Sequence, residues 1–129
     1  NLYEKPVYLS GGQISQMYGM NVFNYPEPAG WIDEQLEYPL ADFNFEVLFT
    51  PGHSPGSISF YNKEHGVLFS GDVLFEGSIG RTDLPGGDHM TLISSIQKKL
   101  LILPHSTKVY SGHGGITTIG QEKMCNPFL

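Results

Sequence analysis

Three apolar stretches of this chain each run into a Gly-containing turn that carries a residue able to bind a metal ion. The turns are Thr50-Pro51-Gly52-His53, Ser70-Gly71-Asp72 and Ser111-Gly112-His113. Two imidazoles and one carboxylate are ligands that zinc and iron take in proteins. The segment between His53 and Asp72 is long enough for a hairpin, and the segment between Asp72 and His113 is long enough for a loop, a helix and a strand. The pattern therefore predicts strands whose ends meet and assemble a shared site.

Alternation of apolar and polar residues predicts the strands that lead into these turns. Phe43 to Thr50 is expected to be a strand buried mainly on one face, because its apolar residues recur at every second position. Ser57 to Tyr61 alternates again, Asn62 to Gly66 is a predicted turn, and Val67 to Ser70 is a predicted buried strand. The resulting hairpin would hold His53 close to Asp72.

The part of the chain between the second and third turns mixes loop, helix and strand signals. Glu76 to Gly87 is predicted to be a long loop without regular structure, and loops of that kind are more often functional. Asp88 is a predicted N-cap for a helix from His89 to Leu101 with one apolar face. A short strand is expected from Thr107 to Ser111. Strands that alternate with helices predict an α/β fold built in layers.

Both ends of the chain give weaker signals. The first forty residues are interrupted by Gly and Pro, and they predict only a short strand from Val7 to Leu9 and a helical turn around Gln13 to Tyr18. Near the other end, Thr118 and Gln121 form a capping-box pattern that predicts a short helix.

Composition narrows the classes of function. A chain of 129 residues is expected to form one domain, and its net charge of −6 with seven Lys and Arg gives little support to nucleic-acid or membrane binding. The longest apolar run, Leu100 to Leu103, is too short to cross a bilayer.

A single cysteine, Cys125, allows no internal disulfide, and a cytoplasmic location is expected. Because the chain starts at Asn1 without an initiator Met, we expect that a preceding segment of the gene product is missing from it.

Each candidate ligand also has an ordinary structural interpretation. Taken alone, His53 is equally well an exposed turn histidine, Asp72 a turn carboxylate satisfied by backbone N–H groups, and His113 a surface histidine in a Gly-rich loop. Arg81 and Asp83 are predicted to orient a ligand or to fix their loop, and the alternative is a surface ion pair of little energetic value. The other histidines are expected to be solvated or to cap helices, namely His65, His89 and His105.

Several longer motifs occur in one order along nearly the whole chain: T-P-G-H-S-P-G-S, S-G-D-V-L-F, G-R-T-D-L-P-G-G-D, G-H-G and the ending T-T-I-G-Q-E-K-M-C-N-P-F-L. In this order they resemble the metallo-β-lactamase-fold hydrolases, and within them the glyoxalase II-like (hydroxyacylglutathione hydrolase-like) branch. The resemblance implies the second half, with part of the first half, of an αββα sandwich. It also implies that His53 binds one metal ion, that His113 binds a second, and that Asp72 bridges the two.

The resemblance further implies a zinc-dependent reaction in which metal-activated hydroxide attacks a thioester carbonyl. The family's H-x-H-x-D-H motif, which supplies the other ligands, does not occur in this chain. We therefore expect one incomplete domain that holds one zinc or none and has impaired activity. Two alternatives stay open. The chain also resembles persulfide dioxygenases of the same superfamily, which use one iron held by two histidines and a carboxylate, and an inactive domain that acts only in assembly is the other.

An incomplete sandwich implies an uncovered sheet face. We expect apolar residues of the predicted strands to form that face: Phe43, Phe45, Val47, Leu68 and Phe69. A large exposed apolar patch drives association. The predicted partners are a small thioester-like substrate and, at the sheet, either a second copy of the chain or the missing N-terminal portion.

Overall fold

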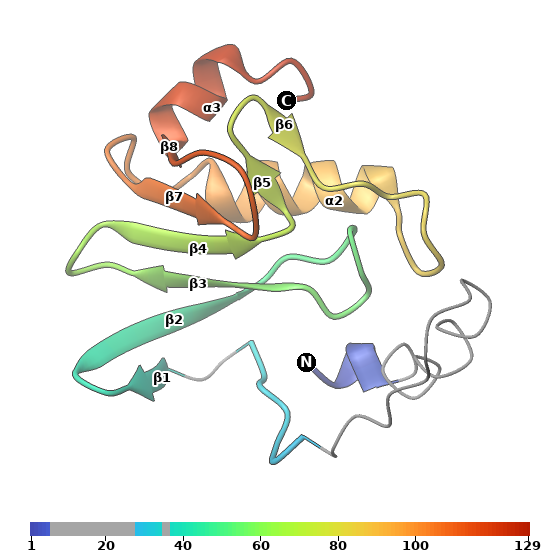
Figure 1. Ribbon diagram of the computed structural model, residues 1–129, viewed down its shortest axis with the longest axis vertical. Coiled ribbons are helices and arrows are strands. Elements are labelled where there is room, and N and C mark those ends of the chain that lie inside the picture. Colours follow the sequence, from blue (N-terminus) through green and yellow to red (C-terminus); the bar gives the residue numbers. More distant parts are fainter. Residues whose placement is uncertain (6–27, 35–36) are drawn as a thin grey trace.

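A mixed six-stranded sheet forms the centre of the protein, which we describe from a computed structural model for residues 1–5, 28–34 and 37–129. The strand order is β1-β2-β3-β4-β7-β8 (Figure 1). The bounds are β1 (Glu37–Leu40), β2 (Phe43–Phe49), β3 (Ile58–Asn62), β4 (Val67–Gly71), β7 (Lys108–Ser111) and β8 (Thr117–Thr118). Neighbouring strands are antiparallel except for β4 and β7, which are parallel.

A small hairpin and several short helices lie outside this sheet. The hairpin consists of β5 (Leu74–Phe75) and β6 (Ser78–Ile79), and the helices are η1 (Leu2–Glu4), α2 (His89–Ser95), η2 (Ile96–Leu100) and α3 (Ile119–Cys125). In Figure 1, α2 passes behind β5, and α3 lies beside the hairpin at the C-terminal end of the chain. None of the helices in the described part of the chain is long and apolar enough to cross a membrane.

The core forms where α2 and η2 pack against the sheet. Leu92, Ile96 and Leu100 recur along one side of these consecutive helices, and all three are fully buried. They belong to one cluster with three buried residues of the sheet: Tyr61, Leu68 and Val109. Leu68 is the cross-strand partner of both Tyr61 and Val109, so these side chains share the face that the helices cover.

The structure confirms the predicted strands β2, β3, β4 and β7 and the predicted helix caps. The Asp88 carboxylate accepts the Thr91 N–H at 2.7 Å, and the Thr118 hydroxyl accepts the Gln121 N–H at 3.2 Å. Strand β1 was not predicted, because Pro39 interrupts its short sequence. Pro39 is compatible with the strand because β1 lies at the edge of the sheet.

Two predicted elements differ from the structure. The segment Glu76 to Gly87 was expected to lack regular structure, but it contains β6, which pairs with β5. The helix expected from His89 to Leu101 is α-helical only to Ser95 and then widens into the π-helical turn η2, in which the Leu101 N–H bonds the Ile96 carbonyl at 2.9 Å. The strand predicted at Val7 to Leu9 and the helical turn around Gln13 to Tyr18 lie outside the described residues.

Aromatic side chains cover the sheet face that lies opposite α2. Phe69 pairs across strands with Phe60 and with Tyr110, so these three share a face. Phe45 contacts the rings of Phe60 and Phe69, with centroids 6.1 and 5.9 Å apart, and Phe43 continues the row. We call this set of five residues, Phe43, Phe45, Phe60, Phe69 and Tyr110, the aromatic face.

The aromatic face corrects the patch expected from the sequence. Leu68 is fully buried under α2, on the other side of the sheet, and Val47 is only 2% exposed. Phe43 and Phe69 are 46% and 44% exposed, as the expected patch requires. Leu68 was therefore placed on the wrong face, because strand periodicity separates two faces without telling which one a helix covers. Val47 pairs with Phe60 and so lies on the aromatic face, but it is buried there and adds no exposed surface.

Candidate metal site

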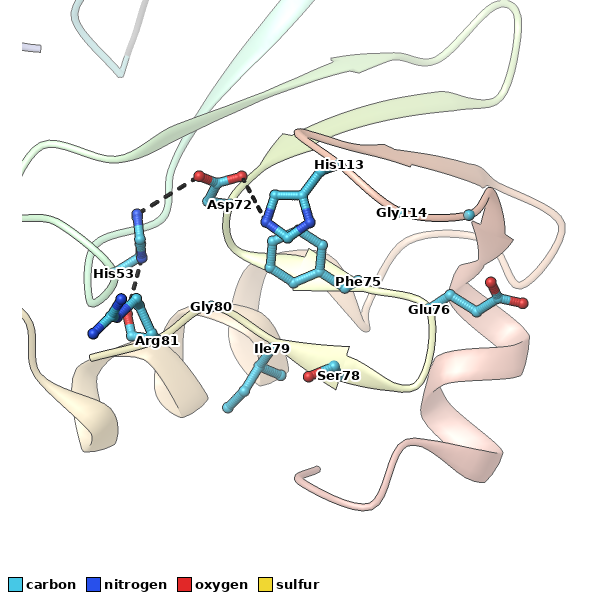
Figure 2. A pocket seen from close by; sticks show the side chains of 11 residues that line it. His53, Asp72, Phe75, Glu76, Ser78, Ile79, Gly80, Arg81, His113 and Gly114 are labelled. Atoms are coloured by element: carbon cyan, nitrogen blue, oxygen red, sulfur yellow. Dashed lines mark hydrogen bonds and ion pairs between the residues drawn. The ribbon is translucent and has the colours of Figure 1, made fainter. Parts of the chain in front are cut away.

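The three predicted ligands come together at the edge where β2, β4 and β7 end (Figure 2). His53 lies in the turn after β2, Asp72 directly follows β4, and His113 follows β7. Parallel pairing of β4 with β7 brings the last two to the same edge, since the carboxyl ends of parallel strands lie side by side. They line one cavity of about 580 Å³, together with residues of the β5–β6 hairpin.

The turn that carries His53 is fixed to the sheet and to α2. The Thr50 hydroxyl lies 3.0 Å from the Ser59 hydroxyl inside the sheet, and both residues are fully buried. The Ser95 hydroxyl donates to the Pro51 carbonyl, and the Asp88 N–H donates to the Gly52 carbonyl, each at 2.8 Å. The turn thus has few degrees of freedom, which holds the imidazole in one place.

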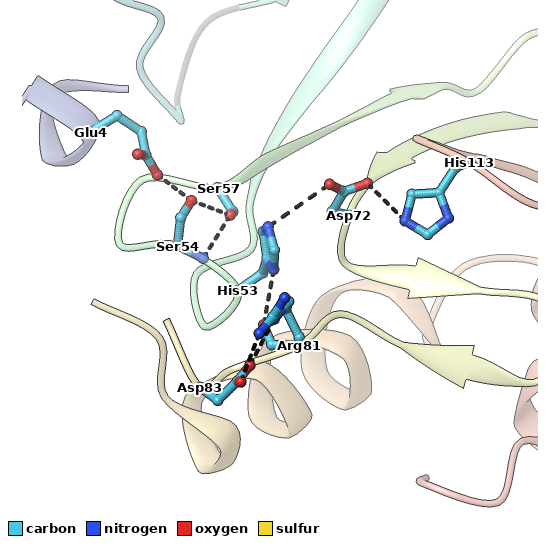
Figure 3. A network of polar contacts seen from close by, with 8 residues as sticks. All are labelled: Glu4, His53, Ser54, Ser57, Asp72, Arg81, Asp83 and His113. Atoms are coloured by element: carbon cyan, nitrogen blue, oxygen red, sulfur yellow. Dashed lines mark hydrogen bonds and ion pairs between the residues drawn. The ribbon is translucent and has the colours of Figure 1, made fainter. Parts of the chain in front are cut away.

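The carbonyl oxygen of Arg81 orients the His53 ring. It lies 2.9 Å from His53 Nδ1 (Figure 3). A carbonyl can only accept, so we assign the hydrogen to Nδ1, which leaves the lone pair on Nε2. His53 Nε2 lies 3.8 Å from Asp72 Oδ2. This is the arrangement of a metal-binding histidine, whose second nitrogen donates to a backbone carbonyl.

A β-bulge directs Asp72 into the cavity. The register between β4 and β7 shifts between Phe69 and Gly71, so Ser70 is the inserted residue. Ser70 is fully buried, and its hydroxyl donates to the Leu74 carbonyl at 2.8 Å, which closes the turn around Asp72. Bulges often re-aim a side chain next to a functional site. The Asp72 side chain remains 43% exposed and is therefore accessible to a ligand.

Two glycines lie so close to Asp72 that a larger residue at either position would clash with it. A Cβ on Gly112 would lie 2.2 Å from Asp72 Oδ1, and a Cβ on Gly80 would lie 2.0 Å from the Asp72 carbonyl oxygen. Either contact is far inside van der Waals range, so any side chain at these positions would displace Asp72. Gly80 and Ser70 were not predicted to shape the site, although they occur in the motifs G-R-T-D-L-P-G-G-D and S-G-D-V-L-F.

His113 approaches Asp72 from the opposite side. Its Nε2 lies 3.9 Å from Asp72 Oδ1, and its ring stacks on Phe75 with centroids 4.5 Å apart (Figure 2). The side chain is 77% exposed, so Phe75 is a major support of its orientation. The role of Phe75 had no signal in the sequence, because the contact joins strand β5 to the turn after β7, far apart along the chain.

The three side chains do not converge on one point. Each histidine faces a different oxygen of Asp72, and no group of three His, Cys, Asp or Glu among residues 1–5, 28–34 and 37–129 is arranged to hold a single ion. The expectation that this chain holds one zinc or none stays a prediction. Ligand atoms about 2.0–2.1 Å from a tetrahedral zinc lie roughly 3.3 Å apart. Each imidazole–carboxylate pair needs to close by only about half an ångström to share an ion, so the donor set fits two ions bridged by Asp72.

Arg81 and Asp83 form an ion pair at the rim of the cavity. Two nitrogens of the guanidinium donate to the two carboxylate oxygens, both at 2.8 Å (Figure 3). These hydrogen bonds from Arg81 lower the pKa of Asp83 to about 2. The pair stiffens the segment whose Arg81 carbonyl contacts His53.

The remaining histidines do not line this cavity. His65, for example, lies in the turn between β3 and β4, where its ring nitrogen Nδ1 is 2.9 Å from Asn62 Oδ1.

Comparison with known protein families matches residues 4–113 to the metallo-beta-lactamase superfamily. The chain belongs to this superfamily. Hydroxyacylglutathione hydrolase GloC of Haemophilus influenzae is 48% identical over 130 residues, which cover all of this chain and 61% of GloC. The chain thus spans about three fifths of that relative.

Solved structures of the superfamily show the same fold. TTHA1623, crystallised in a di-iron-bound form, is 42% identical with a TM-score of 0.85, covering 98% of this chain and 62% of that one. ETHE1 from Myxococcus xanthus is 30% identical with a TM-score of 0.74, covering 92% of this chain and 55% of that one. The fold is therefore the α/β architecture of the metallo-β-lactamase superfamily, of which this chain forms a part.

Proposed function

We propose that this chain carries one part of a two-metal hydrolytic site of the glyoxalase II type, which acts on small thioesters. The observation that supports it is the position of Asp72, whose two oxygens face the Nε2 atoms of two different histidines. A carboxylate placed in this way suits a bridge between two cations. The 48% identity with GloC supports a thioester of the hydroxyacylglutathione kind as the substrate class.

The residues of the chain have distinct roles in this proposal. When bound, the metal ions lower the pKa of a water molecule toward neutrality, which supplies hydroxide for attack on a thioester carbonyl. His53 and His113 would each hold one ion, and Asp72 would hold both. Arg81 acts through its backbone carbonyl, which keeps the Nε2 lone pair of His53 directed at Asp72.

The cavity beside Asp72 offers a place for the substrate. Phe75 and Ile79 give it apolar surface, and Glu76 and Arg81 give it groups of opposite charge. A mixed lining of this kind suits a small molecule with an apolar acyl part and polar ends.

Metal titration tests the role of Asp72. We expect zinc and iron(II) to bind the 129-residue chain weakly, because each ion obtains only two protein ligands from it. Asp72→Asn removes the negative charge and one of the two bridging oxygens, so it should weaken binding by at least about tenfold. Isothermal titration calorimetry gives the affinity and the number of ions per chain.

Asp42→Asn is the matched control, since Asp42 is an exposed carboxylate in the turn between β1 and β2. It should bind metal as the wild type does. Equal metal affinity in Asp72→Asn and the wild type would contradict the proposal. We also expect low thioesterase activity of this chain alone on an S-acyl glutathione.

A second candidate is a mononuclear-iron persulfide dioxygenase, which the sequence motifs also resemble. One iron held by two histidines and a carboxylate suits that chemistry, but here the two imidazoles face separate oxygens. Selective binding of one iron per chain, with oxygen uptake on a persulfide, would favour it. Absence of both zinc and iron binding would favour a domain that acts only in assembly.

The aromatic face supports a proposal about partners. Phe43 and Phe69 leave apolar rings open to solvent on one face of the sheet, and large exposed apolar surfaces are normally covered. We propose that a second copy of the chain, or a further portion of a longer chain, packs on this face.

A further inference from the structure

Glu122 in α3 has a buried carboxylate that accepts a hydrogen bond from the β5–β6 hairpin, which forms one side of the candidate metal site. Glu122 is 1% exposed, although it carries no part of the proposed chemistry. Three donors converge on it: the Thr117 hydroxyl on Oε1 at 2.5 Å, and the Gly77 N–H and the Asn126 amide on Oε2 at 3.0 and 2.8 Å. A buried acid is costly unless it is fully hydrogen-bonded. Its contact with Gly77 joins the C-terminal helix to the turn between β5 and β6.

Asn126 makes a second connection to the same turn. Its side-chain amide donates to the Ser78 carbonyl at 3.0 Å as well as to Glu122. Asn126 is 6% exposed, so this bond is shielded from water. Glu122 and Asn126 therefore hold consecutive residues of the hairpin turn.

The hairpin is in turn connected to all three candidate ligands. Asp72 lies two residues before β5, and the Gly80 N–H donates back to the Val73 carbonyl at 3.1 Å. Phe75 of β5 stacks on His113, and the carbonyl of Arg81, two residues after β6, contacts His53. A shift of the hairpin would move the supports of both imidazoles together.

We infer that Glu122 is a positioning residue for the metal site, which acts through the β5–β6 hairpin on the orientation of His53 and His113. The inference rests on the proposed metal-binding function of these histidines. It assigns a role to the C-terminal motif T-T-I-G-Q-E-K-M-C-N, which supplies Glu122 and two of its three donors, Thr117 and Asn126.

Glu122→Gln tests the inference with little change in shape. Both carboxylate oxygens accept, and an amide offers only one oxygen, so the variant leaves either Thr117 or the Gly77–Asn126 pair facing an NH₂ group. In the metal-free protein we expect the Gly80 amide to exchange with solvent at least about tenfold faster. We also expect the ¹⁵N imidazole signals of His53 to lose the single Nδ1–H tautomer, and the zinc affinity to fall about 10- to 100-fold.

Thr118→Ala is the matched control. It removes the N-cap of the same helix, through the bond to the Gln121 N–H, without touching the hairpin. It should lower the melting temperature and leave the His53 signals, the Gly80 exchange rate and the zinc affinity unchanged. If Glu122→Gln behaves like Thr118→Ala in these three measurements, the inference is wrong.

Asn126→Ala decides the question if circular dichroism shows that Glu122→Gln is unfolded. This variant removes the hydrogen bond to Ser78 and one donor to Glu122. The Gly80 exchange rate and the His53 imidazole signals should therefore change in the same direction as in Glu122→Gln. If both stay unchanged, the inference is wrong.

The amide-exchange and imidazole measurements on the metal-free protein also separate this inference from the proposed function. Absence of zinc and iron binding in the wild type would refute the function, while the metal-free spectra would still show whether Glu122 holds the hairpin.

Discussion

Asp88 shows how one residue joins a structural element to the candidate site. Its carboxylate caps α2 by accepting the Thr91 N–H, and its own N–H donates to the Gly52 carbonyl in the turn before His53. The bond from Thr91 lowers the pKa of Asp88 below the ordinary value of 3.8. A carboxyl with a lowered pKa stabilises the fold above its ordinary pKa, and this contribution is lost as the pH falls through the lower folded value.

Substitution of Asp88 should separate the cap from its charge. Asn is as good an N-cap as Asp but does not titrate. We expect Asp88→Asn to melt within about 2 °C of the wild type at pH 7, and Asp88→Ala to melt roughly 2–5 °C lower. Between pH 5 and pH 3 the wild type should lose more stability than Asp88→Asn. Thermal unfolding followed by circular dichroism at these pH values measures both effects, and parallel acid losses in the two proteins would contradict the assignment.

At the scale of elements, α2 and η2 stabilise the sheet by covering one of its faces. They do so through only a few apolar side chains. Leu92, Ile96 and Leu100 are fully buried against Leu68 and its neighbours. Because α2 is too short to be stable alone, packing must supply most of its stability.

Truncation of Leu92 should therefore be costly. Leu92→Ala leaves a cavity in the core, and we expect it to reduce the free energy of unfolding by about 2–5 kcal/mol. Met90→Ala changes the same helix at a side chain that is 73% exposed, and it should cost less than about 0.5 kcal/mol. Urea denaturation compares the two. Similar losses would show that α2 is not anchored through this face.

Elements with a clear local signal could be predicted from the sequence. The alternation around Val47 predicted β2, and Asp88 and Thr118 predicted where α2 and α3 begin. Strands β5 and β6 were missed because two residues are too few to show a period of two. The bulge at Ser70 was missed because it is a mismatch between strands, which neither strand reveals alone.

The candidate site shows the same division. His53, Asp72 and His113 could be predicted as neighbours because each follows a recognisable strand end. The Arg81 carbonyl could not, because any residue supplies a carbonyl group and only the fold determines where it points. Similarly, Glu122 is an ordinary polar residue of an amphipathic helix in the sequence, and only the structure shows three donors around it.

At the scale of the molecule, the helices and the aromatic face lie on opposite sides of one sheet. The covered side has the packing of a core, whereas the other side exposes rings that stack on one another, such as Phe69 on Tyr110 at 5.5 Å. This asymmetry agrees with a chain that spans about three fifths of GloC.

The aromatic face should control the oligomeric state. We expect the wild-type chain to sediment as an assembled species at micromolar concentration, and the double variant Phe43→Thr, Phe69→Thr to shift toward the monomer, because polar β-branched side chains keep the strands but remove the apolar surface. Ile102→Thr is the control, since Ile102 is 72% exposed in the turn after η2. Analytical ultracentrifugation distinguishes the outcomes, and a strictly monomeric wild type in dilute solution would refute pairing through this face.

The parallel pairing of β4 with β7 has a consequence for how the chain folds. The two strands are joined through the β5–β6 hairpin and α2, so they can pair only after a long stretch of chain has been ordered. Contacts of this non-local kind form slowly, because chain entropy must be lost before they are made. Asp72 and His113 are therefore far apart in a nascent or partly unfolded chain. On the proposed metal-binding function, metal uptake would be restricted to molecules that have finished folding, and each bound ion would in turn favour that finished state.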